Sequence, residues 1–423
     1  MTKELSIPIF DLILCLSEAV DYVSPILNDH HKRVSYIAFR LGQELELPLK
    51  KQKDLAIAGA LHDVGALSLK ERIGLMEFEK DRPYEHAQLG YSFLKTFPPF
   101  TDIAKLIQFH HLPWEHGAGA DFEGERVSTG SHILHLADRV AVLIDEKDEI
   151  LKQAEGIIRK VNRAKGRLFM PELMDAFKGL ASREYFWLDL VVPTAGWASI
   201  TCLDWEPVEL NSENLLELTN LFRRIIDFRS PYTATHSSGV AATAQALSHL
   251  AGFSENEIKM MLIAGYIHDL GKLAVPKEIL EKPGKLSNDE LNVMRHHAYY
   301  TDCILRPISV CDVIRNWGAL HHERLDGSGY PFHLSEKDLP LGSKIMAVAD
   351  VFVALTEDRP YRKGMNQKEA LGVLEKMADN SVLDSEIVSL LRLHFRELNS
   401  VRIAAQETEI NEYNSLFPLI NYS

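Results

Sequence analysis

Apolar residues recur along the chain at the spacing of amphipathic helices. In the stretch SENEIKMMLIAGYIHDLGK they follow the i, i+3, i+4, i+7 positions over residues 258–265, which is the pattern of a buried helix face. Ser254 with Glu257 three residues later has the spacing of a capping box, and Ser287 with Glu290 repeats it before the next apolar stretch. We find no convincing series of alternating strand positions. The pattern therefore predicts an all-α fold.

The polar residues set within this pattern occur in the same order twice, which indicates an internal repeat. The separation is 32 residues in the pairs His30–His62 and His236–His268, and 24 residues in the pairs His86–His110 and His297–His321. The next interval is 27 residues from His111 to Asp138, against 28 from His322 to Asp350. The chain is therefore predicted to contain two copies of one helical domain.

The repeat divides the chain into tandem domains joined by a helical connector. We place the first domain at residues 1–145, the connector at 146–212, the second domain at 213–400 and a C-terminal tail at 401–423. The stretch IPIFDLILCL near the N-terminus lacks the features of a signal peptide, so we expect a helix that docks on the first domain. The apolar, turn-rich stretch VVPTAGWASI in the connector is expected to be buried between the domains or in a homodimer contact.

Composition and charge exclude several classes of function. Of the 423 residues, 46% are hydrophobic and 25% charged, the balance of an ordinary globular protein. The formal net charge of −14 argues against broad binding to DNA, RNA or anionic membranes, so an anionic substrate would need a local positive field. The cysteines are scattered and no run approaches the ~18 apolar residues of a membrane span, so we expect a reduced, cytoplasmic protein.

The second copy contains a set of imidazoles and carboxylates that suits metal ions. Its members are five histidines and two aspartates, namely His236, His268, Asp269, His297, His321, His322 and Asp350. Such a set favours Fe, Mn, Zn or Ni over Mg or Ca, which prefer oxygen ligands. Seven ligands fit two ions bridged by Asp269, the usual arrangement for phosphodiester hydrolysis by a metal-bridging hydroxide. One buried histidine alone is more often structural, but the repeated register favours ligation.

Three basic residues near this set are candidates for contact with a phosphate. Lys272 lies three residues after Asp269 on the predicted helix face, where its ammonium would hold the scissile phosphate or protonate the leaving oxygen. Arg359 and Arg362 in the stretch EDRPYRKG are suited to a bidentate phosphate clamp. The alternatives are a solvated lysine near a helix end and a solvated turn.

The motif HDLGK at 268–272, followed by HHERLDGSGYP at 321–331, resembles the HD-GYP family of the HD phosphohydrolase superfamily over residues 214–398. The resemblance implies a bacterial source, a di-iron or di-manganese centre, and hydrolysis of 3′3′-cGAMP or cyclic di-GMP to the linear dinucleotide. By position, it implies one ion at His236, His268, Asp269 and Asp350, and another at Asp269, His297, His321 and His322. It also implies phosphate contacts for Lys272, Arg359 and Arg362, and a loop at the mouth of the site made of Gly329, Tyr330 and Pro331.

Two departures from the family pattern bear on this expectation. Tyr232 stands where some members carry a glutamate and hold three ions, so we expect two ions. Val353 stands where the family commonly has a further aspartate, so any proton-relay or lysine-orienting role of that residue is absent. Rate and substrate preference are the properties that these departures affect.

The first copy resembles a plain HD domain without the GYP loop. It retains all seven positions, namely His30, His62, Asp63, His86, His110, His111 and Asp138. Ala66 replaces the lysine, and HHLPWEHGAG replaces the loop. The retained residues argue for a second metal site, the missing lysine and loop argue against catalysis, and a scaffolding or sensing role is favoured.

Three hypotheses about function follow. The leading one is a cytoplasmic, metal-dependent cyclic-dinucleotide phosphodiesterase. The second is a non-catalytic signalling adaptor that binds a nucleotide or a partner protein through two HD folds, which the complete second motif opposes. The third is an HD hydrolase of mononucleotides or (p)ppGpp, which the GYP loop disfavours. The residues leave open the choice between 3′3′-cGAMP and cyclic di-GMP, and that among Fe, Mn, Zn and Ni.

Overall fold

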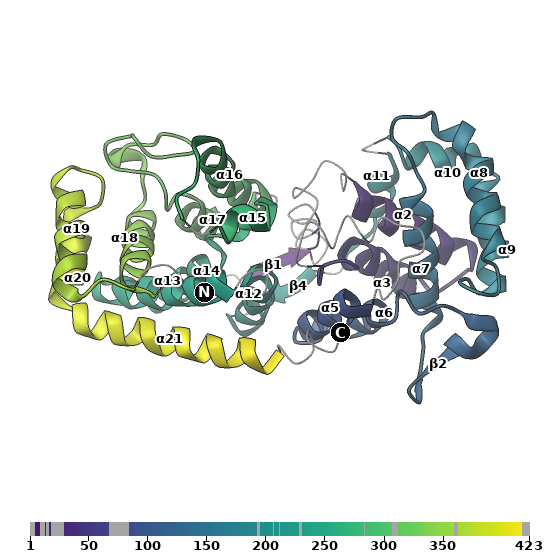
Figure 1. Ribbon diagram of the computed structural model, residues 1–423, viewed down its shortest axis with the longest axis horizontal. Helices are drawn as coiled ribbons and strands as arrows, with labels where there is room; N and C mark the ends of the chain where they lie inside the picture. The colour runs from purple at the N-terminus through teal and green to yellow at the C-terminus, as the bar shows by residue number, and fades with distance from the viewer. Residues whose placement is uncertain are drawn as a thin grey trace. The chain divides into compact units, whose positions relative to one another are not determined.

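The chain forms two compact helical units. The computed structural model describes residues 5–8, 13, 17, 29–66, 84–192, 195–205, 207–210, 212–227, 231–282, 284–306, 312–358 and 363–416. One unit spans residues 8–207 and is called the N-terminal unit; the other spans 208–423 together with 1–7 and is called the C-terminal unit. Helices dominate both (Figure 1), which confirms the predicted all-α class.

The N-terminal unit is organised around α2 (His30–Glu44). Packed on it are α3 (Leu49–Leu61), α7 (Thr129–Val142) and α9 (Pro171–Ala181), while α5 (Tyr84–Leu94) pairs with α6 (Thr101–Gln108). Three further helices lie in the predicted connector and belong to this compact unit: α8 (Ile150–Arg163), α10 (Glu184–Asp189) and α11 (Ala195–Thr201). In the stretch VVPTAGWASI, Ile200 is buried whereas Val191 and Val192 are exposed.

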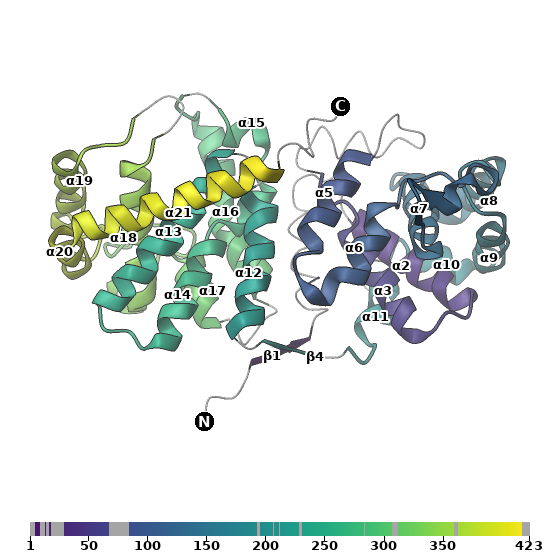
Figure 2. The same cartoon turned by 90° about the horizontal axis from the view of Figure 1, so that it is seen from below.

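The C-terminal unit is organised around α13 (Pro231–Leu250). Four helices pack on it: α12 (Ser212–Asp227), α14 (Glu255–Ile267), α18 (Leu341–Thr356) and α21 (Phe395–Leu416), the last of which runs along α13 (Figure 2). The remaining helices are α15 (Lys277–Leu280), α16 (Asn288–Leu305), α17 (Asp312–Ala319), α19 (Gln367–Asp379) and α20 (Ser385–Leu393). The described part of the tail after residue 400 thus continues a long helix.

Local sequence signals explain where several helices begin. Both predicted capping boxes are present: the Ser254 side chain accepts from the Glu257 amide at the start of α14, and Ser287 and Glu290 do the same for α16. These caps satisfy amide groups that the first helical turn leaves without an internal partner. The capping prediction is therefore confirmed at both helices.

Short strands were not anticipated from the sequence. Strand β1 (Leu5–Pro8) pairs with β4 (Pro207–Leu210), and β2 (Asp121–Phe122) pairs antiparallel with β3 (Glu125–Arg126). Ile7 and Pro8 open the stretch expected to form a docking helix, so that expectation is wrong at its first two residues, and most of the rest lies outside the described residues. Among the described helices, we find none with the length and apolar character that a membrane crossing requires.

Candidate metal centres

Five helices of the C-terminal unit bring the predicted ligands together. His236 lies on α13, His297 on α16 and Asp350 on α18. His268 and Asp269 follow the end of α14, and His321 and His322 follow α17. Candidate ligand atoms lie within 4.8 Å of one another in three groups: His236, His268 and Asp350; His268, Asp269 and His321; and His297, His321 and His322. The predicted residues therefore converge, and their role as ligands stays a prediction.

The turn after His268 and Asp269 depends on a glycine. α14 ends at Ile267 and a 3-10 turn (Leu270–Ala274) follows it, so the expected continuous α-helical face through Lys272 is wrong. A Cβ atom at Gly271 would lie 2.0 Å from the carbonyl oxygen of His297, so only glycine lets the turn approach α16 this closely. The close approach places His297 beside Asp269.

Main-chain hydrogen bonds orient three of these imidazoles. Their Nδ1 atoms lie against carbonyl oxygens three residues earlier, in the pairs His268–Gly265 (2.7 Å), His297–Met294 (2.6 Å) and His321–Gly318 (2.6 Å). Because Nδ1 donates this bond, Nε2 of a neutral ring carries the lone pair that points into the cluster. Burial lowers the pKa of His297 to about 4 and that of His321 to about 3, so both rings are neutral at pH 7.

The convergence of these atoms fits a divalent cation. The Nε2 atoms of His297 and His321 lie 3.4 Å apart, although two neutral rings oriented in this way have no proton to share. Asp269 lies between them and His268, with Oδ1 3.4 Å from His297 Nε2 and Oδ2 3.2 Å from His268 Nε2. The buried Nε2 atom of His268 makes no well-formed hydrogen bond within the described part of the chain. Imidazole lone pairs around one shared carboxylate match the donors that Fe, Mn and Zn prefer.

His236 has carboxylates on both sides of its ring. Its Nε2 atom lies 3.0 Å from Asp350 Oδ1, and its Nδ1 atom lies 3.1 Å from Glu357 Oε2. Burial would lower the pKa of His236, but the charge of Glu357 and the bond with Asp350 raise it to about 10. Glu357 is in turn contacted by Gln406 of α21, whose Nε2 donates to Glu357 Oε2 at 3.3 Å.

Glu357 and Gln406 were missed by the sequence analysis. Glu357 lies seven residues after Asp350, four residues past the position where Val353 replaces the expected aspartate. A carboxylate two helical turns after a ligand is the signal that would have identified it. A ligand histidine that donates its second N–H to a carboxylate is held in the correct orientation and tautomer.

Lys272 lies beside the shared carboxylate. Its ammonium donates to Asp269 Oδ2, and together with His268 it holds the pKa of the buried Asp269 well below its usual range, although burial alone would raise it. The side chain is 19% exposed, so the ammonium is partly accessible. Arg359 and Arg362, the other predicted phosphate contacts, lie outside the described residues.

The loop after His322 is a compact turn held by Glu323. The two carboxylate oxygens of Glu323 accept hydrogen bonds from the amides of Phe332 (2.7 Å) and Leu334 (3.0 Å). Gly329 packs against the backbone of this turn, where a Cβ would lie 2.4 Å from the amide nitrogen of Arg324. The loop brings the Tyr330 ring to 4.8 Å from the His322 ring, and Pro331 follows a cis peptide bond. The GYP residues therefore lie directly beside a candidate ligand.

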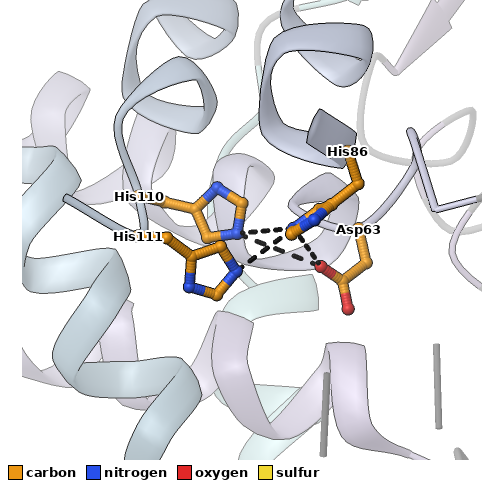
Figure 3. Close-up of side chains that lie close together, drawn as sticks. All are labelled: Asp63, His86, His110 and His111. Carbon is orange, nitrogen blue, oxygen red and sulfur yellow. Dashed lines mark hydrogen bonds and ion pairs between the residues drawn. The ribbon is translucent and has the colours of Figure 1, made fainter. Parts of the chain in front are cut away.

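The N-terminal unit repeats part of this arrangement. Asp63, His86, His110 and His111 form a cluster (Figure 3) in which the candidate ligand atoms lie within 4.8 Å of one another. His86 Nε2 lies 3.2 Å from Asp63 Oδ1, 3.4 Å from His110 Nε2 and 3.1 Å from His111 Nε2. A Cβ atom at Gly65 would lie 2.1 Å from the carbonyl oxygen of His86, which is the same close approach as at Gly271.

The other half of the N-terminal cluster differs. His30 Nε2 lies 3.4 Å from Asp138 Oδ1 and His62 Nε2 lies 3.8 Å from the same atom. Arg139, which the sequence analysis did not single out, donates to Asp138 Oδ2 from Nε at 3.1 Å and from Nη2 at 2.6 Å. Ala66 is buried at the position equivalent to Lys272, so that position supplies no ammonium.

Comparisons with known families agree with this repeated geometry. Two HD-domain families match the chain, one over residues 28–143 and the other over residues 220–387. The chain belongs to the HD phosphohydrolases and carries two HD domains. This family implies the use of divalent metal ions, and both units contain clusters of histidines and aspartates that could bind them.

Several characterised proteins are similar to the chain. The 3′3′-cGAMP-specific phosphodiesterase 1 of Vibrio cholerae is 29% identical over 405 residues, which cover 93% of this chain and 94% of that protein. A cyclic di-GMP phosphodiesterase of Pseudomonas aeruginosa is 41% identical over 145 residues, 33% of this chain and 34% of its own length. The crystal structure of a cyclic GMP-AMP-specific phosphodiesterase of V. cholerae matches with a TM-score of 0.65 at 23% identity, covering 92% of this chain and 98% of that one.

Proposed function

We propose that the chain is a metal-dependent phosphodiesterase that hydrolyses a bacterial cyclic dinucleotide to the linear dinucleotide in its C-terminal unit. The observation that carries the proposal is the position of Asp269, whose two oxygens face different histidines while Lys272 contacts the same carboxylate. Relatives named as phosphodiesterases of 3′3′-cGAMP and of cyclic di-GMP support this substrate class. Since the relative that covers 93% of the chain is cGAMP-specific, 3′3′-cGAMP is the first substrate to test.

Asp269 and the imidazoles around it would hold two divalent ions, Fe or Mn. Bound ions of this kind polarise phosphate oxygens and make water acidic enough to attack at neutral pH. The protein holds the donors still: the main-chain carbonyls orient three imidazoles, and Glu357 orients His236. In the reaction a water oxygen forms the new bond to phosphorus, and the bond to a ribose oxygen breaks.

Lys272 is proposed to serve the leaving group. Its ammonium is the one cation that the described residues place on Asp269, and it is partly accessible. A positioned ammonium would stabilise or protonate the ribose oxygen as it leaves. The loop of Gly329, Tyr330 and Pro331 would border the bound nucleotide, because the Tyr330 ring lies beside His322.

The first prediction is that Asp269→Ala abolishes hydrolysis. Removing the shared carboxylate separates the two halves of the C-terminal cluster, so the metal bound in this cluster and turnover should both be lost. The assay supplies 3′3′-cGAMP and cyclic di-GMP side by side to protein loaded with Fe²⁺ or Mn²⁺, and identifies products by mass.

The exposed Asp379→Ala serves as the matched control and should retain both properties. Turnover that survives in Asp269→Ala would contradict the assignment of the site. Tight nucleotide binding by the loaded wild-type protein without any product would instead favour a signalling adaptor.

A further inference from the structure

The two units differ at the residue that follows the last aspartate of the cluster. In the N-terminal unit this residue is Arg139, and at the equivalent position after Asp350 it is Val351. The Arg139 guanidinium makes two hydrogen bonds to Asp138 Oδ2, and both residues are at most 3% exposed. An arginine does not lose its proton in a protein, so a permanent cation is fixed on this carboxylate.

A fixed cation changes what this half of the cluster can bind. The Lys272 ammonium beside Asp269 is partly exposed, whereas the Arg139 guanidinium is buried and fixed on Asp138 by two hydrogen bonds. Its charge offsets that of Asp138 and would repel a divalent ion held by the same carboxylate. In the C-terminal unit, His236, His268 and Asp350 converge within 4.8 Å. Among the described residues of the N-terminal unit, the converging trio is His30, His62 and Asp63, without Asp138. Arg139 therefore occupies one oxygen of the aspartate whose counterpart, Asp350, belongs to the trio of the C-terminal unit.

The other half of the N-terminal cluster keeps a complete donor set. Asp63, His86, His110 and His111 are all at most 5% exposed and supply one carboxylate and three imidazoles. His110 Nδ1 lies 2.7 Å from the carbonyl oxygen of Ile107, which leaves its Nε2 lone pair directed at the cluster. Asp63 Oδ1 is buried and makes no well-formed hydrogen bond within the described part of the chain. No lysine or arginine in that part forms an ion pair with Asp63.

We propose that the N-terminal unit binds a single divalent ion at Asp63, His86, His110 and His111, and that Arg139 replaces a second ion at Asp138. Four buried nitrogen and oxygen donors can fill the tetrahedral shell of one ion, for which Zn²⁺ is suitable. The site is separate from the proposed reaction, and it does not depend on that reaction being correct. The N-terminal unit would therefore hold one ion, against the two proposed for the C-terminal unit.

The test counts ions in full-length protein whose C-terminal cluster has been disabled by Asp269→Ala and His297→Ala. After loading with Zn²⁺ and gel filtration in metal-free buffer, mass spectrometry of the metal should find one ion per chain. Adding His110→Ala should remove this ion, whereas the matched change His30→Ala should leave it. Chelation should lower the melting temperature of the background protein and leave that of the His110→Ala protein unchanged.

A gain of binding tests the role of Arg139. In the same background, Arg139→Val supplies the residue found at position 351 and frees Asp138, so the count should rise from one ion to two. No retained ion in the background, or loss of the ion with His30→Ala but not with His110→Ala, would overturn the proposed site. A count that stays at one with Arg139→Val would overturn the replacement by arginine. Hydrolysis by the wild-type protein is measured separately, so failure of the proposed function is distinguished from failure of this site.

Discussion

Single buried histidines make the stability of the metal-free protein depend on pH. Burial lowers the pKa of His297 to about 4, whereas the same side chain in the unfolded chain titrates near 6.5. As the pH falls from 6.5 toward 4, the unfolded chain binds protons first, and the free energy of unfolding decreases by up to about 3 kcal/mol from this residue. The contribution of His297 is therefore present above pH 6.5 and lost in acid.

His236 contributes with the opposite sign. Burial would lower its pKa, but Glu357 and Asp350 raise it to about 10. Its contribution is complete below pH 6.5 and is lost as the pH rises toward 10. The two residues together predict that the chelated protein is most stable near neutral pH and weaker on both sides.

Calorimetry of the chelated protein across this pH range measures both effects. His297→Asn should make the acid side of the curve less steep, since His321 still titrates there, and leave the alkaline side unchanged. A melting temperature that does not fall on acidification would contradict the neutral, buried state of His297.

At the level of elements, we expect a single methyl group added to the turn after α14 to destabilise the protein. Gly271→Ala would place a Cβ 2.0 Å from the His297 carbonyl oxygen, so the turn and α16 must separate. We expect a loss of about 1–3 kcal/mol in the free energy of unfolding, together with weaker metal binding. Denaturant unfolding and metal titration measure the two quantities.

Gly372→Ala in α19 provides the control for this prediction. Nothing lies within 4 Å of a Cβ at that helical position, so alanine should be neutral or stabilise by up to about 1 kcal/mol. Equal effects of the two substitutions would show that the close approach at Gly271 does not matter.

A second element-scale prediction concerns α21, which reaches the cluster through Gln406 and Glu357. Glu357→Gln keeps the size of the side chain but removes the charge that His236 Nδ1 faces. Loss of such a partner typically weakens metal affinity about 10–100-fold. Competition with a chelator measures the affinity for Mn²⁺ directly.

Glu407→Gln is the matched control, since Glu407 is exposed on α21, next to Gln406. It should leave the affinity unchanged. An unchanged affinity in Glu357→Gln as well would show that Glu357 does not orient His236.

Across the whole molecule, the repeat and the helix caps are the features of the sequence that allowed correct predictions. Two sets of seven histidines and aspartates in one register predicted the convergence of both clusters, and the caps predicted the starts of α14 and α16. Glu357 and Arg139 could not be predicted in the same way, because a charged residue near a helix end is usually solvated. Only the packing of α18 and α21 against α13, and of α7 against α2, shows that both are buried beside candidate ligands.

The last prediction compares the two units at equivalent positions. Asp63 and Asp269 occupy the same place in the repeat. Lys272 contacts the Asp269 carboxylate, whereas the position equivalent to Lys272 in the N-terminal unit is Ala66, which has no charge. Asp269→Ala should therefore abolish hydrolysis, whereas Asp63→Ala should leave kcat/KM of the folded protein largely unchanged and lower its melting temperature. Kinetics on the monodisperse fraction and calorimetry of both variants separate the two effects. Equal loss of hydrolysis in both variants would mean that the N-terminal cluster takes part in the reaction.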